Sequence, residues 1–214
     1  MQETLIKTQE YIKSILKDEF TGHDYYHAIR VKNVANNILQ KEGGNKFVVS
    51  MASLLHDVVD DKIQDSLDSS CQKFDEFFNS LNINKETKEE ILYIINNMSF
   101  SKMLSNKVNI TKELAIVSDA DKIDSLGAIG IARTFAYGSK VGNKIYDPEI
   151  LPEINLTQEE YKRKGRKTTS LNHFDEKLLK LDKYLLTETG KEIAGERIEF
   201  VRVFKERFLE EWEC

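Results

Sequence analysis

The sequence predicts an all-α protein folded as a single domain, and three observations carry this prediction. Apolar residues recur at helical spacing along most of the chain, while few stretches alternate polar and apolar residues as strands do. Only two prolines occur among the 214 residues, so little in the chain forbids long helices. No internal repeat, low-complexity tract or shift in composition indicates a linker, and a chain of this length can bury a sizeable core.

The apolar stripes place the expected helices in chain order. The first spans residues 2–18, the second spans 24–42 and stops at Gly43-Gly44, and a short apolar third spans 46–57. Further helices are expected at residues 74–81, 91–98, 114–124, 128–136, 169–186 and 190–212.

The C-terminal third of the chain contains a loop and a long helix. Both prolines and several turn signals lie between Gly138 and about Gln158, which predicts a long loop. The last helix carries an aromatic stripe at spacing four, a pattern more typical of core than of an interface: Phe200, Phe204, Phe208 and Trp212.

Composition excludes several classes of protein. A net charge of -5 and a pI near 5.5 make the chain a poor candidate for binding long nucleic acid, although a local pocket could still attract a small anion. No apolar run approaches the roughly 20 residues that span a bilayer, and the N-terminus lacks the apolar core of a signal peptide. We therefore expect a cytoplasmic protein without a membrane partner. Cys71 and Cys214 lie in no CxxC pattern, and reduced thiols are expected rather than a disulfide.

The histidines are few, and their neighbours carry information. His23 and His27 are four residues apart and share a helix face if the helix starts early enough. His56 and Asp57 are adjacent and end an apolar helix. Imidazole together with carboxylate suits Mn²⁺, Fe²⁺, Co²⁺ or Ni²⁺, and can also take Mg²⁺ or Zn²⁺.

A third segment is rich in aspartate: Asp119, Asp121 and Asp124 crowd the expected helix at 114–124. Asp121 has apolar neighbours on both sides, so its carboxylate is expected to be buried and to need a partner. A metal is one such partner, and a salt bridge to a lysine or arginine is the other.

These segments resemble the HD superfamily of metal-dependent phosphohydrolases. The order His27, His56-Asp57, Asp121 is similar to the HD signature, and the texts HDYYHAIRV, LLHDVVDDK and SDADKIDSLGAIGIARTFAYG are similar to its ligand segments. The last of these, with LNHFDEKLLKL and TETGKEIAGER further on, resembles a bacterial subfamily of small nucleotide pyrophosphohydrolases, the YpgQ/YedJ type. The likeness covers most of the chain from His23 onward.

The resemblance implies an HD-type helical bundle, with a catalytic core at about 20–140 and C-terminal helices at about 168–213 packing on it. It implies one divalent metal, with Mn²⁺ favoured, held by His27, His56, Asp57 and Asp121. The metal would polarise the phosphoryl group and lower the pKa of the attacking water. Asp119 and Asp124 are expected to lie behind the ligands and support them.

Asp60 and Asp61 follow the His56-Asp57 pair and resemble the HDxxED segment of HD alarmone hydrolases, with Asp in place of Glu. By that resemblance, both would orient or deprotonate the attacking water. The alternative is that they only cap the following turn.

Binding of phosphate requires cations or other donors. The candidates for contact with substrate are His23, Arg30, Lys62, Arg133, His173 and Lys177. His23 could instead cap a helix start, Arg133 is a lone cation among apolar residues that suits a buried role, and a lysine is by default solvated. The basic run Tyr161–Lys167 is either a phosphate-attracting loop or a solvated one.

The resulting hypothesis is a divalent-metal-dependent nucleotide pyrophosphohydrolase. It would convert a nucleoside or deoxynucleoside triphosphate to monophosphate and pyrophosphate. An HD nucleotide phosphomonoesterase or phosphodiesterase is the nearer alternative, and a non-catalytic nucleotide-binding HD module is the more distant one. The sequence leaves open the base, the sugar, the physiological metal and a homodimer.

Overall fold

Helices account for most of the computed structural model, which describes residues 1–17, 19, 22–58, 67–98, 108–154 and 165–213, and the side chains of these except 67–71. The contacts divide the chain into an N-terminal unit, Met1–Asp121, and a C-terminal unit, Lys122–Cys214. The prediction of a single domain stays a prediction.

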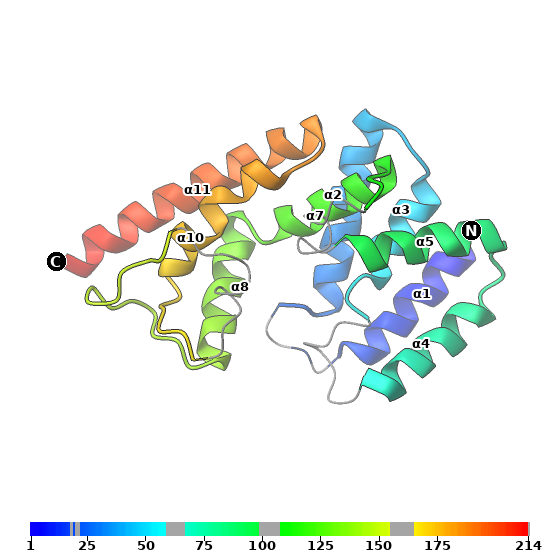
Figure 1. The fold of residues 1–214 in the computed structure, drawn as a ribbon, viewed down its shortest axis with the longest axis horizontal. Coiled ribbons are helices and arrows are strands. Elements are labelled where there is room, and N and C mark those ends of the chain that lie inside the picture. The colour runs from blue at the N-terminus through cyan, green and yellow to red at the C-terminus, as the bar shows by residue number, and fades with distance from the viewer. Residues whose placement is uncertain (18, 20–21, 59–66, 99–107, 155–164, 214) are drawn as a thin grey trace. The chain divides into compact units, whose positions relative to one another are not determined.

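The N-terminal unit is built around one buried helix (Figure 1). Its helices are α1 (Gln2–Ile15), α2 (Tyr25–Glu42), α3 (Lys46–Leu55), α4 (Leu67–Ser80), α5 (Lys85–Asn97) and most of α7 (Lys112–Asp124). Every residue of α3 from Val48 to Leu55 is buried, and α3 packs against α1, α2 and α5. A helix that is apolar all round needs such cover on every side, which places α3 at the centre of the core.

Capping residues next to the helices determine where α2 and α3 begin and where α2 ends. The Asp24 carboxylate accepts a hydrogen bond from the backbone N–H of His27 and caps α2, and Asn45 caps α3 in the same way. Gly43 ends α2 with a φ of 73°, a conformation that glycine adopts without strain. Because α2 begins at Tyr25, His23 precedes the helix and does not share its face with His27.

The C-terminal unit contains the last residues of α7, α8 (Gly127–Lys140), α10 (Asn172–Glu176), the 3₁₀ helix η1 (Leu178–Tyr184) and the long α11 (Glu188–Glu213). α11 packs against α8 and η1. An aromatic cluster joins these elements, in which each ring lies within 6.3 Å of at least one other: Phe135, Phe174, Phe204, Phe208, Tyr146 and Trp212.

The all-α prediction is confirmed, since the described residues contain no strand beyond one isolated bridge between Lys144 and Thr169. α3 ends at Leu55, and residues 56–58 form a turn in place of the expected last helical residues. The expected helix at 169–186 is broken into α10 and η1, because Lys177 leaves helical geometry with φ −138° and ψ −59°.

Three remaining predictions have separate outcomes. In the aromatic stripe, Phe204, Phe208 and Trp212 belong to the cluster, although Trp212 is 50% exposed. Phe200 is also 50% exposed. The Cys71 side chain and Cys214 lie outside the described residues. Among the described helices, none has both the length and the apolar character needed to cross a membrane.

Candidate metal centre

Two histidines and an aspartate meet where the start of α2 lies beside the end of α3. His27 lies in the first turn of α2, and His56 and Asp57 follow the last residue of α3. Their side chains are 1%, 3% and 12% exposed, so all three are withdrawn from water. One ligand atom from each lies within 4.8 Å of the other two.

The distances converge on one point. The Nε2 atoms of His27 and His56 are 3.2 Å apart. Asp57 places Oδ2 3.2 Å from Nε2 of His27 and Oδ1 3.4 Å from Nε2 of His56. Asp121 comes from α7, and its Oδ1 lies 3.5 Å and 3.7 Å from the same two nitrogens. The structure therefore brings together all four residues that the sequence pointed to as ligands.

The charges at this point reinforce each other. Burial by itself would lower the pKa of His56, but the carboxylates of Asp57 and Asp121 outweigh it and raise that pKa to about 9. Burial would likewise raise the pKa of Asp57, but His56 and His27 hold it well below its usual value. Asp57 therefore stays negatively charged, and the ring of His56 beside it favours the positively charged form.

The residues fit a divalent metal, and two observations carry this test. Nδ1 of His56 lies 2.8 Å from the Ser53 carbonyl, which can only accept, so Nδ1 carries a proton and Nε2 is the atom turned toward the centre. Nε2 of His56 and Nε2 of His27 face each other at 3.2 Å, an approach that a shared proton or a bound cation stabilises. In addition, Asp57 Oδ2 is buried and makes no hydrogen bond within the described part of the chain. Two nitrogen and two carboxylate donors suit the first-row divalent ions.

Asp121 differs from its prediction in one respect. Its side chain is 40% exposed, so the expectation of a buried carboxylate is wrong. The carboxylates that α7 buries are Asp119, 0% exposed, and Asp124, 1% exposed. α7 is buried on every side from Leu114 to Ala120, and Asp121 and Lys122 are the first residues after that stretch to be partly exposed. The supporting role of Asp119 and Asp124 stays a prediction.

Two candidates for substrate contact lie beside the centre. His23 stands just before α2, with its ring edge-on to His27 at a centroid distance of 5.6 Å, and its backbone N–H donates to Glu19. Asp24, not His23, caps the helix. Arg30 is half-buried on α2, less than one turn after His27. Asp60, Asp61 and Lys62 lie outside the described residues.

The other three candidates lie in the C-terminal unit. Arg133 donates from Nη1 to Oδ2 of Asp124 at 2.9 Å, and only 14% of its side chain is exposed, as suits the buried role predicted for it. Burial lowers the pKa of His173 to about 3, and the positive charges of Lys177 and Arg166 add to the effect. Lys177 is exposed and ends α10, so His173 and Lys177 do not both lie within one helix. Contact with substrate stays a prediction for all three.

Some of the important contacts were not predicted. The Ser53 carbonyl orients His56, and the signal was available, because a helix leaves its last carbonyls free for nearby side chains. From the basic run Tyr161–Lys167, Arg166 makes a two-pronged ion pair with Glu176 at 2.6 and 2.8 Å. Both side chains are at most 7% exposed. Arg166 is therefore structural, which neither interpretation of that run anticipated.

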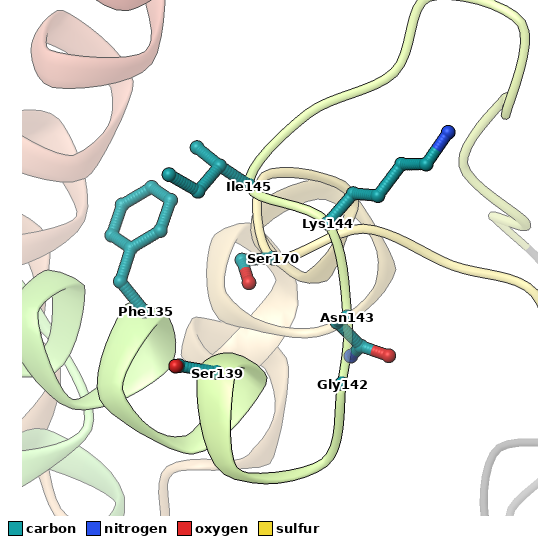
Figure 2. A pocket seen from close by; sticks show the side chains of 7 residues that line it. All are labelled: Phe135, Ser139, Gly142, Asn143, Lys144, Ile145 and Ser170. Atoms are coloured by element: carbon teal, nitrogen blue, oxygen red, sulfur yellow. The ribbon is translucent and has the colours of Figure 1, made fainter.

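A cavity of about 400 Å³ in the C-terminal unit is separate from these residues (Figure 2). Phe135 and Ser139 of α8 form one wall, and the segment Gly142–Ile145 and Ser170 face them. Among the described residues that line it, Lys144 is the charged one, and none is a histidine or a carboxylate. This cavity therefore offers no metal ligands.

Comparisons with known proteins agree with this assignment of the site. The model of the HD domain matches residues 24–126, a range that contains all four centre residues. The protein YpgQ of Bacillus subtilis is 32% identical over 197 residues, which cover 91% of this chain and 86% of YpgQ.

Solved structures of similar proteins share this fold. A protein from Lactobacillus plantarum superposes with a TM-score of 0.84 and 34% identity over 100% of this chain and 98% of its own. An HD-superfamily hydrolase from Bacillus thuringiensis has a TM-score of 0.76 and 39% identity over the same shares. Bacillus subtilis YpgQ in complex with ADP has a TM-score of 0.75 and 28% identity over 97% of each chain.

Proposed function

The chain belongs to the HD domain family, and on that premise we propose that it is a nucleotide pyrophosphohydrolase that depends on a divalent metal. Membership makes it an HD-superfamily hydrolase, as the similar protein from Bacillus thuringiensis is named. One observation carries the proposal: the Nε2 atoms of His27 and His56 lie 3.2 Å apart, and each of the carboxylates of Asp57 and Asp121 lies within 3.7 Å of both.

In this proposal His27, His56, Asp57 and Asp121 hold the metal, and Mn²⁺ is the ion we favour. A bound divalent metal polarises a phosphoryl group and stabilises the charge that develops on its oxygens. The protein's own contribution is orientation: the Ser53 carbonyl fixes the ring of His56, and burial of His27 and Asp57 keeps water from competing for their ligand atoms.

A nucleotide is the proposed substrate class. The support is the structure of the similar protein YpgQ, which was solved with ADP. On this chain, Arg30 and His23 lie beside the metal ligands on the same stretch of α2 and its approach, where a guanidinium and an imidazole can bind phosphate oxygens.

The proposed reaction is hydrolysis at the α-phosphorus. The oxygen of water forms a bond to that phosphorus, the bond to the bridging oxygen breaks, and pyrophosphate leaves with the electron pair. Asp60 and Asp61 are proposed to accept the proton of the water, by the resemblance given above. The cytoplasmic location and the homodimer stay predictions.

Product analysis with a panel of nucleoside and deoxynucleoside triphosphates tests the proposal. With Mn²⁺, the protein is expected to release monophosphate and pyrophosphate. Asp121→Ala is expected to lose activity about 100-fold or more, because it removes an anionic ligand. The matched control is Asp75→Ala, an exposed aspartate of α4 in the same unit, which should keep full activity.

Each outcome decides between functions. Inorganic phosphate in place of pyrophosphate would make the chain an HD phosphomonoesterase or phosphodiesterase. A nucleotide that copurifies and is never turned over would make it a binding module. The absence of turnover with Mn²⁺, Co²⁺, Ni²⁺ and Mg²⁺ would refute the enzyme, and full activity of Asp121→Ala would refute the site.

A further inference from the structure

The carboxyl end of α7 is held by an arginine from a distant part of the sequence. Nη1 of Arg197, on α11, donates to the backbone carbonyl of Ile123 at 2.7 Å. The same carbonyl accepts from the N–H of Leu126 at 3.1 Å. The last carbonyls of a helix have no partner within it and carry its partial negative charge, so a guanidinium is well suited to bind them.

A second arginine holds the same helix end through a side chain. Arg133, on α8, donates to the carboxylate of Asp124, which is 1% exposed. A buried carboxylate is costly without a partner, so this pair ties the last residue of α7 to α8. Ile123 and Asp124 are thus fixed by one arginine each.

The turn between α7 and α8 is tightly packed. Gly127 has a φ of 68°, and a Cβ there would lie 3.3 Å from Cγ of Arg197, so the aliphatic stem of the arginine packs directly on the turn. A Cβ at Gly130 would lie 2.0 Å from the carbonyl oxygen of Ser125, so α8 starts in close contact with this turn. α7 therefore ends at a tightly packed point and not in a free loop.

Asp121 lies two residues before Ile123, and it is the most exposed of the four proposed ligands, at 40% against 12% or less for the others. The Cα of Asp121 moves with the backbone of α7, and this backbone determines which positions its short side chain can reach. Movement of the end of α7 would carry Asp121 Oδ1 away from the nitrogens of His27 and His56, now at 3.5 and 3.7 Å.

We propose that Arg197 is a positioning residue, which holds the end of α7 so that Asp121 stays within ligand distance of His27 and His56. The proposal rests on the metal site of the proposed function. It gives a role to the run Thr187–Arg197, in which Thr187 caps the start of α11 by accepting from the N–H of Gly190 and Arg197 reaches Ile123.

The test is the affinity for Mn²⁺ alone, measured by calorimetry without nucleotide and well below the melting temperature of each variant. Arg197→Met keeps the aliphatic stem and removes the guanidinium. We expect it to weaken Mn²⁺ binding about tenfold, the lower end of the effect of residues that orient metal ligands. Arg197→Lys keeps a cation at the helix end and is expected to lose clearly less.

Two controls separate positioning from general loss of stability. Arg202→Met removes an arginine on the same helix that is 51% exposed and pairs with Glu199, and should bind Mn²⁺ as the natural protein does. Ile198→Ala removes a side chain that is 6% exposed beside Arg197, and should lower the melting temperature but not the affinity.

The outcomes are distinct. Normal Mn²⁺ affinity in Arg197→Met overturns the positioning role, even when its melting temperature falls. Equal weakening in Ile198→Ala and Arg197→Met overturns it as well, because the effect would then follow stability. If the natural protein itself binds no Mn²⁺, the metal site of the proposed function fails, and the positioning role fails with it.

Discussion

Nε2 of His27 and Nε2 of His56 face each other at 3.2 Å, although the residues are 29 positions apart, His27 on α2 and His56 directly after α3. The packing of α2 against α3 produces this approach. On α2 the buried face includes Val31, Ala35 and Ile38, while α3 is buried from Val48 onward. The distance between the imidazoles is thus determined by the hydrophobic core and does not depend on a flexible loop.

Replacing the buried carboxylate of Asp57 should abolish the stabilisation of the protein by Mn²⁺. Asp57→Asn replaces an anionic ligand with a neutral amide, so the natural protein should be stabilised by Mn²⁺ and the variant should not. A ligand at 100 times its Kd stabilises by about 2.7 kcal/mol. Thermal unfolding with Mn²⁺ and with a chelator measures both, and Asp75→Asn is the matched control. A metal-dependent shift that persists in Asp57→Asn would contradict the assignment of this ligand.

The ion pair between Arg133 and Asp124 should be a large contributor to stability when only one partner is removed. Arg133→Met removes the guanidinium from a carboxylate that is 1% exposed, which is expected to cost up to about 3–5 kcal/mol in urea unfolding. Lys144→Met is the control, because Lys144 is 67% exposed in its pair with Asp147 and its loss should change stability little.

A double variant distinguishes the pair from packing alone. Arg133→Met with Asp124→Leu removes both charges, so it should recover most of the stability that Arg133→Met loses. If the double variant is as unstable as the sum of the single variants, the ion pair is not the origin of the loss. Arg133→Met also tests substrate contact, which would appear as a raised KM for nucleotide in the folded variant.

The helix boundaries that sequence predicts well are those with a local signal. α2 was expected at 24–42 and spans Tyr25–Glu42, because Asp24 and Gly43 lie at its two ends. The expected helix at 169–186 had no such signal at Lys177, where it breaks. Glu176, directly before the break, is bound by Arg166, a contact that no apolar spacing along the chain reveals.

At the candidate metal centre, the sequence predicted which residues come together, but not how far the side chain of Asp121 is buried. His27, His56 and Asp57 converge as the resemblance implied, but spacing alone could not have paired residues so far apart. The exposed fraction of Asp121 depends on where along α7 the cover of the core ends, and residues 114–120 are buried on every side while Asp121 is 40% exposed. The sequence pattern does not show that boundary. The bond from Arg197 to Ile123 joins residues 74 positions apart and gave no local signal.

His173 should make the protein less stable in mild acid. Its pKa is about 3 in the folded protein, below the ordinary 6.5, so the folded state holds it neutral. As the pH falls from 6.5 toward 3, the unfolded chain gains a proton that the folded chain does not, and this costs at most about 1.4 kcal/mol per pH unit. Above pH 6.5 the effect is absent.

The variant His173→Gln tests this dependence, because its side chain does not titrate. At pH 7 the variant is expected to be the less stable protein, since it loses the packing of the ring. The difference in free energy of unfolding between the natural protein and His173→Gln should shrink as the pH is lowered to 5. At that pH the natural protein is destabilised, because its folded state keeps the imidazole of His173 unprotonated. A difference that stays constant between pH 7 and pH 4.5 would show that His173 is not held neutral.

Two glycines in helices should respond to alanine in opposite directions. A Cβ at Gly130 would lie 2.0 Å from the backbone oxygen of Ser125, which cannot move without opening the turn after α7, so Gly130→Ala is expected to destabilise by about 1–3 kcal/mol. Gly195, in the middle of α11, has nothing within 4 Å of the same position. Gly195→Ala should therefore stabilise by about 0.5–1 kcal/mol, because alanine loses less backbone entropy in a helix. Urea unfolding of both variants measures the contrast. A Gly130→Ala protein as stable as Gly195→Ala would mean that α8 does not start against Ser125, and the close packing that supports the end of α7 would have to be abandoned.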